Sequence, residues 1–508
     1  MHEVCSSLLK RLAVGGAAVT ILLTVARGQC NFVSVPIGSG FNGGVNEIAT
    51  VGDDVYVGGN FTSVPGASVS AMARFDGSSW DDVGGGLTGL PPWALFPPIP
   101  FANAVVAAPN GDVLVGGQFA AAGGVAANSI ARWDGASWHA MGSGPNSVVH
   151  TIAVMPNGDV VAGGAFTHMD GVAVNHIARW DGATWSPLGG GVAAGPIGTM
   201  VRELAVAPNG DLIAVGSFTT AGGVPANGVA RWDGSSWSAM GNIGILLIGD
   251  AGLAVAPNGD VYLGGSLTLN GAQFWMARWD GTSWTQVPHN GPSWPRSLKV
   301  MPNGDVIGMH SPSASFWYLS RWNGSSWSTI TPVNNVVSSI ALSDAGEVYL
   351  GGVFSAVGGS TQFYFGAVAT TCGASVAPLG PGCPSAGGSN LLEAKNQPWA
   401  GATFRAQATG LPPISVAAVV TGFATDFVPL QLLFGMSQPT CISLTSGNVI
   451  DLGLPVGGAL ITEVDIPNDP ALAGQHLYHQ VIPFELNALG HCVDVSATNA
   501  IDLTVGFF

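Results

Sequence analysis

The sequence predicts an all-β protein: a seven-bladed β-propeller with four-stranded blades, followed by a β-sandwich. Three observations carry this prediction. A segment of the form Arg-aromatic-Asp/Asn-Gly-x-x-Trp recurs six times, at glycine spacings of 58, 47, 52, 47 and 43 residues. A Pro-Asn-Gly-Asp turn recurs in step with it, and only 9% of the residues are charged while 75 are glycine. Repeats of this period are typical of propellers, solenoids and arrays.

The composition also excludes some classes of protein. A hydrophobic content of 47% is too high for a disordered chain. The formal net charge of -16 argues against a nucleic-acid partner, because no excess of Lys or Arg is present to neutralise phosphates.

The first 29 residues are predicted to be a secretory signal peptide. Lys10 and Arg11 precede an apolar run over residues 12–26, and small residues near Ala26 and Gly28 offer cleavage sites. A single membrane anchor is the alternative, but a spanning helix needs about 20 apolar residues. We therefore expect a secreted or cell-surface protein with no spanning segment after cleavage, in an oxidising compartment where cysteines tend to pair.

One repeat can be followed over residues 147–191. Strands are expected at 148–155, 160–166, 176–180 and 185–188, and the first two are joined by Asn157-Gly158, a type I′ hairpin signal. Four antiparallel strands of this length make one propeller blade. Seven such units are predicted, with their first turns at 52–54, 109–112, 156–159, 208–211, 257–260, 302–305 and 344–347.

The ends of the repeat region favour a closed ring over a solenoid. Residues 32–38 match a fourth strand, and residues 365–370 match a third strand that lacks its own fourth. The N-terminal strand is therefore expected to complete the last blade, whereas a solenoid would cap each end separately. Cys30 and Cys372 flank this seam, and a disulfide between them would stabilise it by roughly 2–5 kcal/mol. The propeller is assigned to residues 30–372.

The repeats resemble those of the kelch family and of the related galactose-oxidase-like propellers. The resemblance rests on paired glycines that end the second strand, the aromatic-Asp turn and the Trp that opens the fourth strand. It covers about residues 32–372, and it implies a fold but no activity. In two units Gly216-Ser217 and Gly308-Met309 are expected to replace the glycine pair.

Two recurrent residue types are open to a structural and a functional interpretation. The Trp residues that flank each Asp-Gly turn are expected to pack as cross-strand pairs, with sugar stacking as the alternative. An arginine recurs in each third strand and is expected to pair with the Asp that closes the Asn-Gly turn, with a ring of cations for anionic ligands as the alternative. These arginines are Arg74, Arg132, Arg179, Arg231, Arg278 and Arg321.

Ligand binding is expected on the face of the propeller where the connections vary in length. Aligning the units places a polar column on the first strands near that face, formed by Asn46, Asn103, His150, Arg202, Arg296 and Ser338. Two of the variable loops add Trp93 and His168 as further candidates. The alternatives are a hydrated channel without a ligand and an apolar loop that folds over the blade beneath it.

No catalytic residue, metal site or cofactor is predicted. A copper radical oxidase needs a Cys beside a ligand Tyr, but Tyr56, Tyr262 and Tyr349 are equivalent strand residues and no Cys lies between Cys30 and Cys372. No calcium loop, nucleophile elbow or phosphate loop stands out. His476 and His479 are expected to face opposite sides of a strand, which argues against a metal site there.

The repeats stop after Cys372. Residues 373–389 are predicted to be a linker rich in Gly, Pro and Ser, and residues 390–508 a β-sandwich of short strands. Segments 382–384 and 466–474 are similar to the C-terminal domains of secreted bacterial proteins of unknown role. Connectivity cannot be fixed from sequence, but the preferred second disulfide joins Cys383 to Cys441 and leaves Cys492 over.

The function predicted from these features is non-catalytic recognition or scaffolding, in which the variable-loop face binds an extracellular protein or glycan. The competing prediction is a hydrolase or lyase acting on polysaccharide, with Glu47 and Glu203 as the first carboxylates to test. A third prediction gives the C-terminal domain a role in attachment or export. The sequence does not determine the ligand or the oligomeric state.

Overall fold

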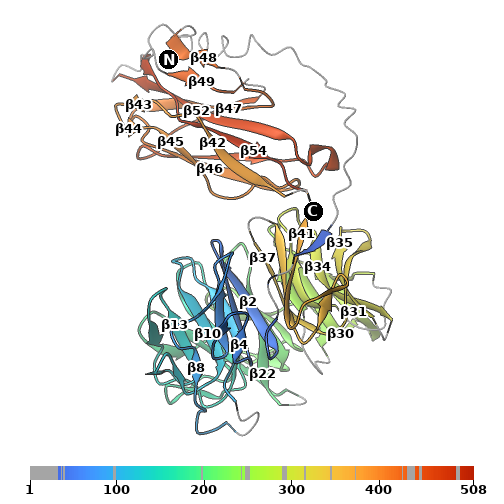
Figure 1. The fold of residues 1–508 in the computed structure, drawn as a ribbon. Helices are drawn as coiled ribbons and strands as arrows, with labels where there is room; N and C mark the ends of the chain where they lie inside the picture. Colours follow the sequence, from blue (N-terminus) through green and yellow to red (C-terminus); the bar gives the residue numbers. More distant parts are fainter. Residues whose placement is uncertain are drawn as a thin grey trace. The chain divides into compact units, whose positions relative to one another are not determined.

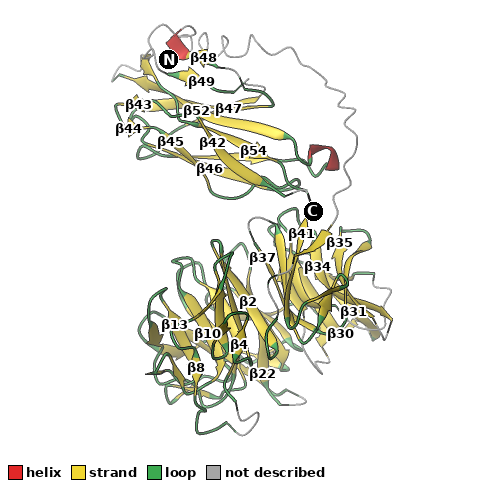
Figure 2. Ribbon diagram, in the orientation of Figure 1, coloured by secondary structure: helices red, strands yellow, loops and turns green. Residues whose placement is uncertain are grey.

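The computed structural model describes residues 32–35, 37, 40–94, 99–195, 198–241, 243–245, 252–269, 271–288, 295–313, 316–343, 346–371, 373–425, 427–431, 441–445, 449–487 and 492–507. The predicted signal peptide, Cys30 and Cys372 lie outside these residues. Strands and turns dominate the described chain, with a short 3-10 helix at Pro470–Leu472 (Figure 2). None of the helices in the described chain is both long and apolar enough to cross a membrane.

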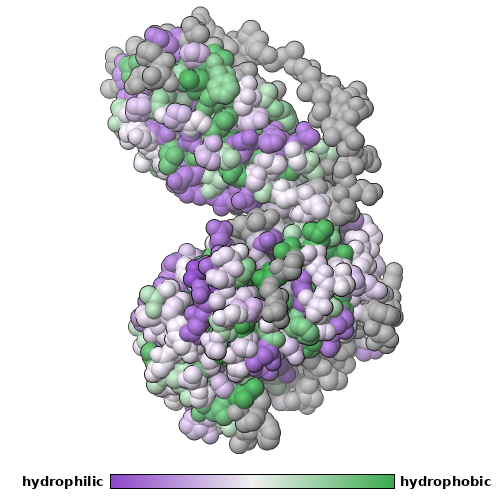
Figure 3. Space-filling view, viewed as in Figure 1, coloured by the Kyte–Doolittle hydropathy of each residue, from purple (hydrophilic) through white to green (hydrophobic). Residues whose placement is uncertain are grey.

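The chain divides into two compact units (Figure 1). The first, which we call the repeat domain, holds Phe32–Ser343 and Glu347–Ala369; the second, the C-terminal domain, holds Thr370–Phe508. In Figure 1 the repeat domain runs from blue to yellow and the C-terminal domain is orange and red. Much of the visible surface is pale in Figure 3, because glycine, serine, threonine and tryptophan have intermediate hydropathy.

Each repeat folds into an antiparallel sheet whose strands follow chain order. We number these sheets 1 to 7. Sheet 1 consists of β2 (Val45–Val51), β3 (Asp54–Gly59), β6 (Met72–Phe75) and β7 (Trp80–Asp82). Sheet 2 consists of β9 (Phe101–Ala107), β10 (Val113–Gln118), β13 (Ile130–Trp133) and β14 (Trp138–Ala140). Sheet 3 consists of β15 (Val149–Val154), β16 (Val160–Gly164), β19 (Ile177–Trp180) and β20 (Trp185–Pro187).

Sheets 4 to 6 repeat this order. Sheet 4 consists of β22 (Met200–Val206), β23 (Leu212–Ser217), β26 (Val229–Trp232) and β27 (Trp237–Ala239). Sheet 5 contains β29 (Gly252–Val255), β30 (Val261–Leu269), β31 (Ala272–Trp279) and β32 (Trp284–Gln286). Sheet 6 contains β33 (Arg296–Val300), β34 (Val306–Ser313), β35 (Phe316–Trp322) and β36 (Trp327–Val333).

Sheet 7 combines the two ends of the repeat domain. It holds β37 (Val337–Leu342), β38 (Glu347–Gly352) and β41 (Phe365–Thr370), and its fourth strand is β1 (Phe32–Val35) from the start of the described chain. The first strands of successive sheets contact one another in order, and β37 of sheet 7 contacts β2 of sheet 1.

Paired glycines at the end of the second strand let neighbouring sheets approach closely. A β-carbon on Gly58 would lie 2.5 Å from Val105 Cγ2, on the first strand of the next sheet. A β-carbon on Gly59 would lie 2.1 Å from the Gly44 carbonyl oxygen, at the start of its own sheet. The first glycine is therefore needed for packing between sheets, and the second for packing within one.

The predicted replacements of this pair need correction. In sheet 4 the register places Val215-Gly216 at the pair, not Gly216-Ser217, because Val201 lies opposite Gly216 just as Val45 lies opposite Gly59. In sheet 6, Met309 lies opposite Leu319 just as Gly58 lies opposite Met72, so the pair is Met309-His310. The error was one residue in each case, because a lone glycine was taken as the first member of the pair, whereas Gly216 is the second member and Gly308 precedes the pair.

The recurrent arginines form ion pairs within their own sheets, as predicted. Each pairs with the Asp at the start of the second strand or just before it: Arg74–Asp54, Arg132–Asp112, Arg179–Asp159, Arg231–Asp211, Arg278–Asp260 and Arg321–Asp305. In sheets 2 to 6 the Asn of the same turn donates from Nδ2 to that Asp, at 2.8 Å for Asn110 and Asp112. These cations are therefore held by partners within their own sheets.

The recurrent tryptophans form the predicted cross-strand pairs. Five Trp–Trp cross-strand pairs have ring centroids 5.3–5.8 Å apart. The second Trp of a pair also joins its sheet to the one before, since Trp138 Nε1 donates to the Val83 oxygen at 2.8 Å and Trp185 Nε1 to the Met141 oxygen at 2.7 Å. A buried indole normally needs such a partner.

The segment between the second and third strands, expected to be irregular, contains a two-residue hairpin in several sheets. In sheet 3 it consists of β17 (His168–Met169) and β18 (Val172–Ala173). Equivalent hairpins are β4 (Ser63–Val64) with β5 (Ala67–Ser68), β11 (Ala121–Ala122) with β12 (Val125–Ala126), β24 (Thr220–Ala221) with β25 (Val224–Pro225), and β39 (Ala356–Val357) with β40 (Ser360–Thr361). These hairpins are too short to show an alternating sequence pattern.

The C-terminal domain has a six-stranded and a three-stranded antiparallel sheet. The first contains β42 (Ser375–Leu379), β54 (Ala500–Thr504), β52 (His476–Leu486), β47 (Ser415–Gly422) and β50 (Val449–Gly453), with β53 (Cys492–Val495) paired to β52. The second contains β45 (Leu391–Ala394), β46 (Thr403–Thr409) and β51 (Leu460–Asp465). The segment predicted as a linker, 373–389, thus contains a strand of the larger sheet.

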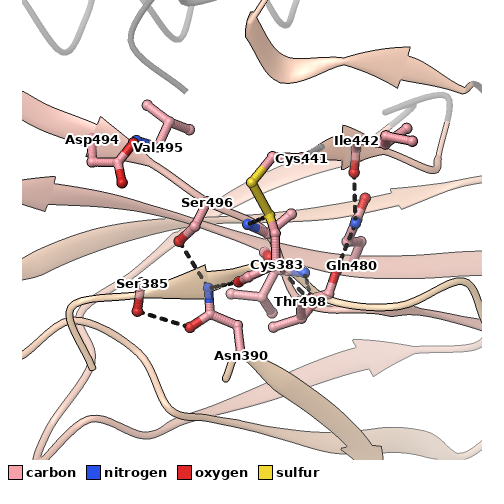
Figure 4. Close-up of a disulfide and its surroundings, with 12 residues drawn as sticks. Cys383, Ser385, Asn390, Cys441, Ile442, Gln480, Asp494, Val495, Ser496 and Thr498 are labelled. Carbon is pink, nitrogen blue, oxygen red and sulfur yellow. Dashed lines mark hydrogen bonds between the residues drawn. A yellow bond between two sulfur atoms is a disulfide. The ribbon is translucent and has the colours of Figure 1, made fainter. Parts of the chain in front are cut away.

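Side chains of both sheets share one hydrophobic core, which includes Phe404, Val481 and Leu503. A second core contains Cys383, Cys441 and Ile482, and there the predicted disulfide between the two cysteines is formed (Figure 4). Next to it the Asn390 amide donates to the Cys383 carbonyl oxygen and to Ser496 Oγ, both at 2.8 Å (Figure 4).

Candidate functional site

The predicted polar column occupies irregular positions on the first strands. In sheet 1, Val45 lies opposite Gly59 and Glu47 opposite Gly58, so Asn46 is the extra residue of a bulge. The same shift occurs in sheets 2, 3, 4 and 7, where the extra residues are Asn103, His150, Arg202 and Ser338. A bulge re-aims its side chain and is common beside functional sites.

Arg296 differs from the other members of the column. It lies opposite Met309, and the next pair joins Lys299 to Ile307. The first strand of sheet 6 therefore has two unpaired residues at this point, where the first strands of sheets 1, 2, 3, 4 and 7 have one. The Arg296 guanidinium lies over the Trp317 ring at 5.8 Å from its centroid. Stacking of this kind holds the cation on a rigid surface.

Two members of the column connect neighbouring sheets. Asn46 Nδ2 donates to the Ala102 oxygen at 2.8 Å, and Asn103 Nδ2 donates to the Val149 oxygen at 3.2 Å, in each case on the first strand of the next sheet. Ser297 does the same toward Ser338, donating to its carbonyl oxygen at 2.7 Å. These side chains hold the first strands together, so the capacity for a ligand rests on the other members.

Positive charge that is not used in the repeated ion pairs is concentrated on the first strands. The repeat domain has nine Lys and Arg residues, all of them described, and six form the Arg–Asp pairs. The remaining three are Arg202 on β22 and Arg296 and Lys299 on β33. Lys299 is exposed.

His150 adds a neutral donor and acceptor to this group. Burial lowers the pKa of its imidazole to about 4, and the nearby positive charge of Arg202 acts in the same direction. The imidazole is therefore uncharged at neutral pH, so it can donate or accept a hydrogen bond without adding positive charge to the group.

The two carboxylates of the competing enzyme hypothesis lie next to the column. Burial raises the pKa of the Glu47 carboxyl, while the positive charge of Lys299 opposes the change. Ser339 Oγ donates to Glu47 Oε1 at 2.8 Å and accepts from the Ile48 amide at 3.2 Å. Glu203 occupies the matching register position in sheet 4, opposite Val215.

The two loop candidates have separate surroundings. Trp93 is partly buried, and its Nε1 donates to the Pro145 oxygen at 3.2 Å, so the loop is held by the connection between sheets 2 and 3. His168 is exposed on β17, and its Nδ1 lies 3.0 Å from Thr167 Oγ1. No contact joins either residue to the polar column among the described residues, so their role in a ligand site stays a prediction.

An apolar cavity at the other end of the first strands was not predicted. It has a volume of about 410 Å³ and lies where β22, β29, β33 and β37 end. The Pro residues of the Asn-Gly turns, Pro208, Pro257 and Pro302, line it together with Val and Ala neighbours. The Pro-Asn-Gly-Asp motif predicts a hairpin turn, but it does not show that the Pro side chains of neighbouring turns meet around one cavity.

Among the described residues, no three or more His, Cys, Asp or Glu side chains are grouped so that they could hold a metal ion. Tyr56 and Tyr262 lie opposite equivalent arginines, as expected for strand residues of a repeat. In the C-terminal domain, His479 is fully buried and His476 is exposed beside Asp502, in agreement with the predicted opposite orientations.

Comparison with known proteins supports a β-propeller. The model of a β-propeller domain of unknown function, DUF5122, matches residues 207–233, which cover the first Asn-Gly turn and third strand of sheet 4. No curated protein matches the chain. The chain thus contains a β-propeller domain.

Three solved structures are similar at low identity. The WD40 β-propeller domain of Doa1 is 12% identical, with a TM-score of 0.40 over 67% of this chain and 96% of that one. The gluconolactonase XC5397 from Xanthomonas campestris is 13% identical, with a TM-score of 0.32 over 68% and 99%. PorZ, a surface component of the type-IX secretion system of Porphyromonas gingivalis, is 10% identical, with a TM-score of 0.30 over 91% and 52%.

Proposed function

We propose that this is an exported, non-catalytic recognition protein whose propeller binds an acidic group of an extracellular protein or glycan at the polar column. The proposal includes a closed, seven-bladed, kelch-like propeller and a C-terminal β-sandwich. Pairing of β1 with β41 and the succession of contacts from β2 to β37 and back to β2 support the closed ring. The Cys383–Cys441 disulfide supports export, because such bonds persist in oxidising compartments.

One observation carries the proposed ligand chemistry. In a chain with a net charge of -16, the three repeat-domain cations outside the Arg–Asp pairs all lie on two first strands, β22 and β33. A cationic site surrounded by an acidic molecule attracts anions locally while the rest of the surface repels them. Arg296, held over Trp317, offers the planar fork that binds a carboxylate with two hydrogen bonds.

The test measures binding of two acidic probes and one neutral probe to the full chain. A polyglutamate peptide and an oligogalacturonate represent protein and glycan partners, and dextran is the neutral control. Binding of either acidic probe should weaken at least tenfold in the double variant R202Q/R296Q and should also weaken with added salt. The probe that binds identifies the class of partner.

The matched control is R179Q, which removes a cation held in an Arg–Asp pair and should change affinity less than twofold. The proposal fails if neither acidic probe binds, or if R179Q weakens binding as much as R202Q/R296Q.

The polysaccharide hydrolase or lyase remains the second candidate because of Glu47. A buried carboxyl whose pKa is raised holds its proton to a higher pH than an exposed one, as a general acid needs. Release of reducing or unsaturated ends from an acidic polysaccharide by the native chain, abolished in E47Q and E203Q, would favour this candidate over pure recognition.

A further inference from the structure

Three of the positions at which sheet 6 departs from the repeat are His310, Ser320 and Asn323. His310 occupies the place of the second glycine of the pair. Ser320, which lies opposite Gly308, occupies the position at which the third strands of sheets 1 to 5 have Ala. Asn323 replaces the Asp that begins the Asp-Gly turn in those five sheets. In sheet 2 the equivalent residue is Gly117, and a β-carbon there would lie 2.2 Å from the Phe101 oxygen, too close for any side chain. A histidine fits in sheet 6 because its first strand has a different register.

Two of these departures line one cavity of about 260 Å³. His310 and Ser320 form part of its wall, together with Trp322, Trp327, Thr329 and Pro288. The serines of the turn that begins at Asn323 line it as well, and Asn323 Oδ1 accepts from the Ser325 amide at 3.0 Å. Three departures of this sheet, His310, Ser320 and Asn323, thus lie at or beside the same cavity.

The aromatic wall of the cavity is formed by His310 and Trp327. Their rings are stacked, with centroids 5.7 Å apart and planes 10° apart. Trp327 is only partly buried, whereas the equivalent Trp residues of sheets 1 to 5 are 5–6% exposed. Part of the indole therefore faces the cavity and offers an apolar surface to a ligand.

A buried hydroxyl without a partner marks the polar side of the cavity. Ser320 is 1% exposed, and its Oγ has no hydrogen-bond partner within the described chain. Leaving a buried hydroxyl unsatisfied costs roughly 1–3 kcal/mol, which the Ala of the other repeats avoids. A ligand with its own hydroxyl would satisfy Ser320, while Thr329 and the turn serines provide further hydroxyls at the rim.

The described residues of the cavity wall carry no formal charge. None of them is Asp, Glu, Lys or Arg, and Asn323 replaces the carboxylate that borders this position in sheets 1 to 5. Arg321, on the opposite face of the strand, pairs with Asp305. Burial also lowers the pKa of the His310 imidazole, which is neutral at neutral pH. The chemistry of the wall fits a neutral, hydroxyl-rich ligand with one apolar face.

We propose that the cavity of sheet 6 binds a neutral pyranose ring, with one face of the sugar on Trp327 and its hydroxyls on Ser320 and His310. A volume of about 260 Å³ lies just below the usual range for ligand pockets and suits a single small ring. The site is separate from the polar column and does not depend on the function proposed for it.

The test uses saturation-transfer NMR and tryptophan fluorescence with the full chain. The probes are methyl α-D-glucopyranoside, methyl β-D-galactopyranoside and methyl N-acetyl-β-D-glucosaminide, with methyl glucuronide as the charged counterpart. At least one neutral glycoside should bind and should quench or shift the Trp emission. The glucuronide should bind at least tenfold more weakly than its neutral equivalent.

Two variants restore the residues of the repeat itself. S320A and H310G should each weaken glycoside binding at least tenfold with an unchanged far-UV spectrum, since Ala and Gly are tolerated at these positions in other sheets. A178S places a hydroxyl at the position of Ser320 in sheet 3, where Gly164 remains, and should leave binding unchanged. The inference is overturned if no neutral glycoside binds, if S320A and H310G bind as the native chain does, or if the glucuronide binds equally well.

Discussion

The two domains satisfy their polar groups in opposite ways. In the repeat domain, the partners of the recurrent ion pairs lie 16–20 residues apart along the chain and recur from sheet to sheet, such as Arg132 with Asp112. In the C-terminal domain, polar side chains are buried and meet partners from other strands: His479 lies between the hydroxyls of Thr421 and Thr462, at 2.8 Å from each. Because the contacts of the repeat domain recur, they can be predicted, and the stability of that domain is spread over many small interactions. The C-terminal domain depends instead on a few contacts that each occur once.

The largest expected effect in this comparison is loss of the Cys383–Cys441 disulfide. The bond closes a separation of 58 residues, and loop-closure entropy gives it about 4 kcal/mol. The double variant C383A/C441A should lower the unfolding temperature of the C-terminal domain and leave that of the repeat domain unchanged, as followed by calorimetry. Equal stability of the native and variant C-terminal domains would contradict a special role for single contacts there.

Crowding at the glycine pair should give the largest single-residue effect in the repeat domain. In G117A the new β-carbon would lie 2.2 Å from the Phe101 oxygen, a backbone atom that cannot rotate away, so a cost of about 3 kcal/mol is expected. The control G66A adds the same methyl group in a turn with open space, where only the positive φ is strained, at about 1 kcal/mol. Chemical denaturation measures both, and equal losses would rule out the crowding argument.

These contrasts explain how far the sequence could be interpreted. The ion pairs, the Trp pairs and the strand order of each sheet recur, so one repeat explains the others. The residues that replace the glycine pair, such as Met309-His310, could not be placed, because a single glycine does not show which residues of the two strands lie opposite each other. The first-strand positions of the polar column could be aligned from the sequence, and its role as a ligand site stays a prediction. The use of Asn46 and Asn103 to bond the next sheet depends on bulges that have no sequence signal. The partners of His479 are 58 and 17 residues away and follow no pattern.

The buried His479 should make the C-terminal domain sensitive to acid. Burial lowers the pKa of the folded imidazole to about 4 from 6.5, so the unfolded chain takes up the proton first as the pH falls. The stability contribution is complete above pH 6.5 and decreases progressively toward pH 4, by roughly 3 kcal/mol. Denaturation between pH 4 and 7 should show this loss in the native chain.

The variant H479Q should flatten that dependence, because its side chain does not titrate. H476Q removes the exposed imidazole three residues earlier and serves as the matched control, which should keep the acid sensitivity of the native chain. Retention of the full pH dependence in H479Q would assign the effect to another group.

The smallest expected effect tests whether the repeated contacts are individually weak. Arg132 is 38% exposed, and its ion pair with Asp112 is screened by solvent, so R132Q should cost less than about 1 kcal/mol. Because the same pair recurs on separate sheets, removing three of them in R132Q/R179Q/R231Q should cost close to the sum of the single losses. Urea denaturation of the native chain, the three single variants and the triple variant measures this additivity. A single variant that costs several kcal/mol would show that one pair has a role that the others lack, and would remove the distinction between the two domains.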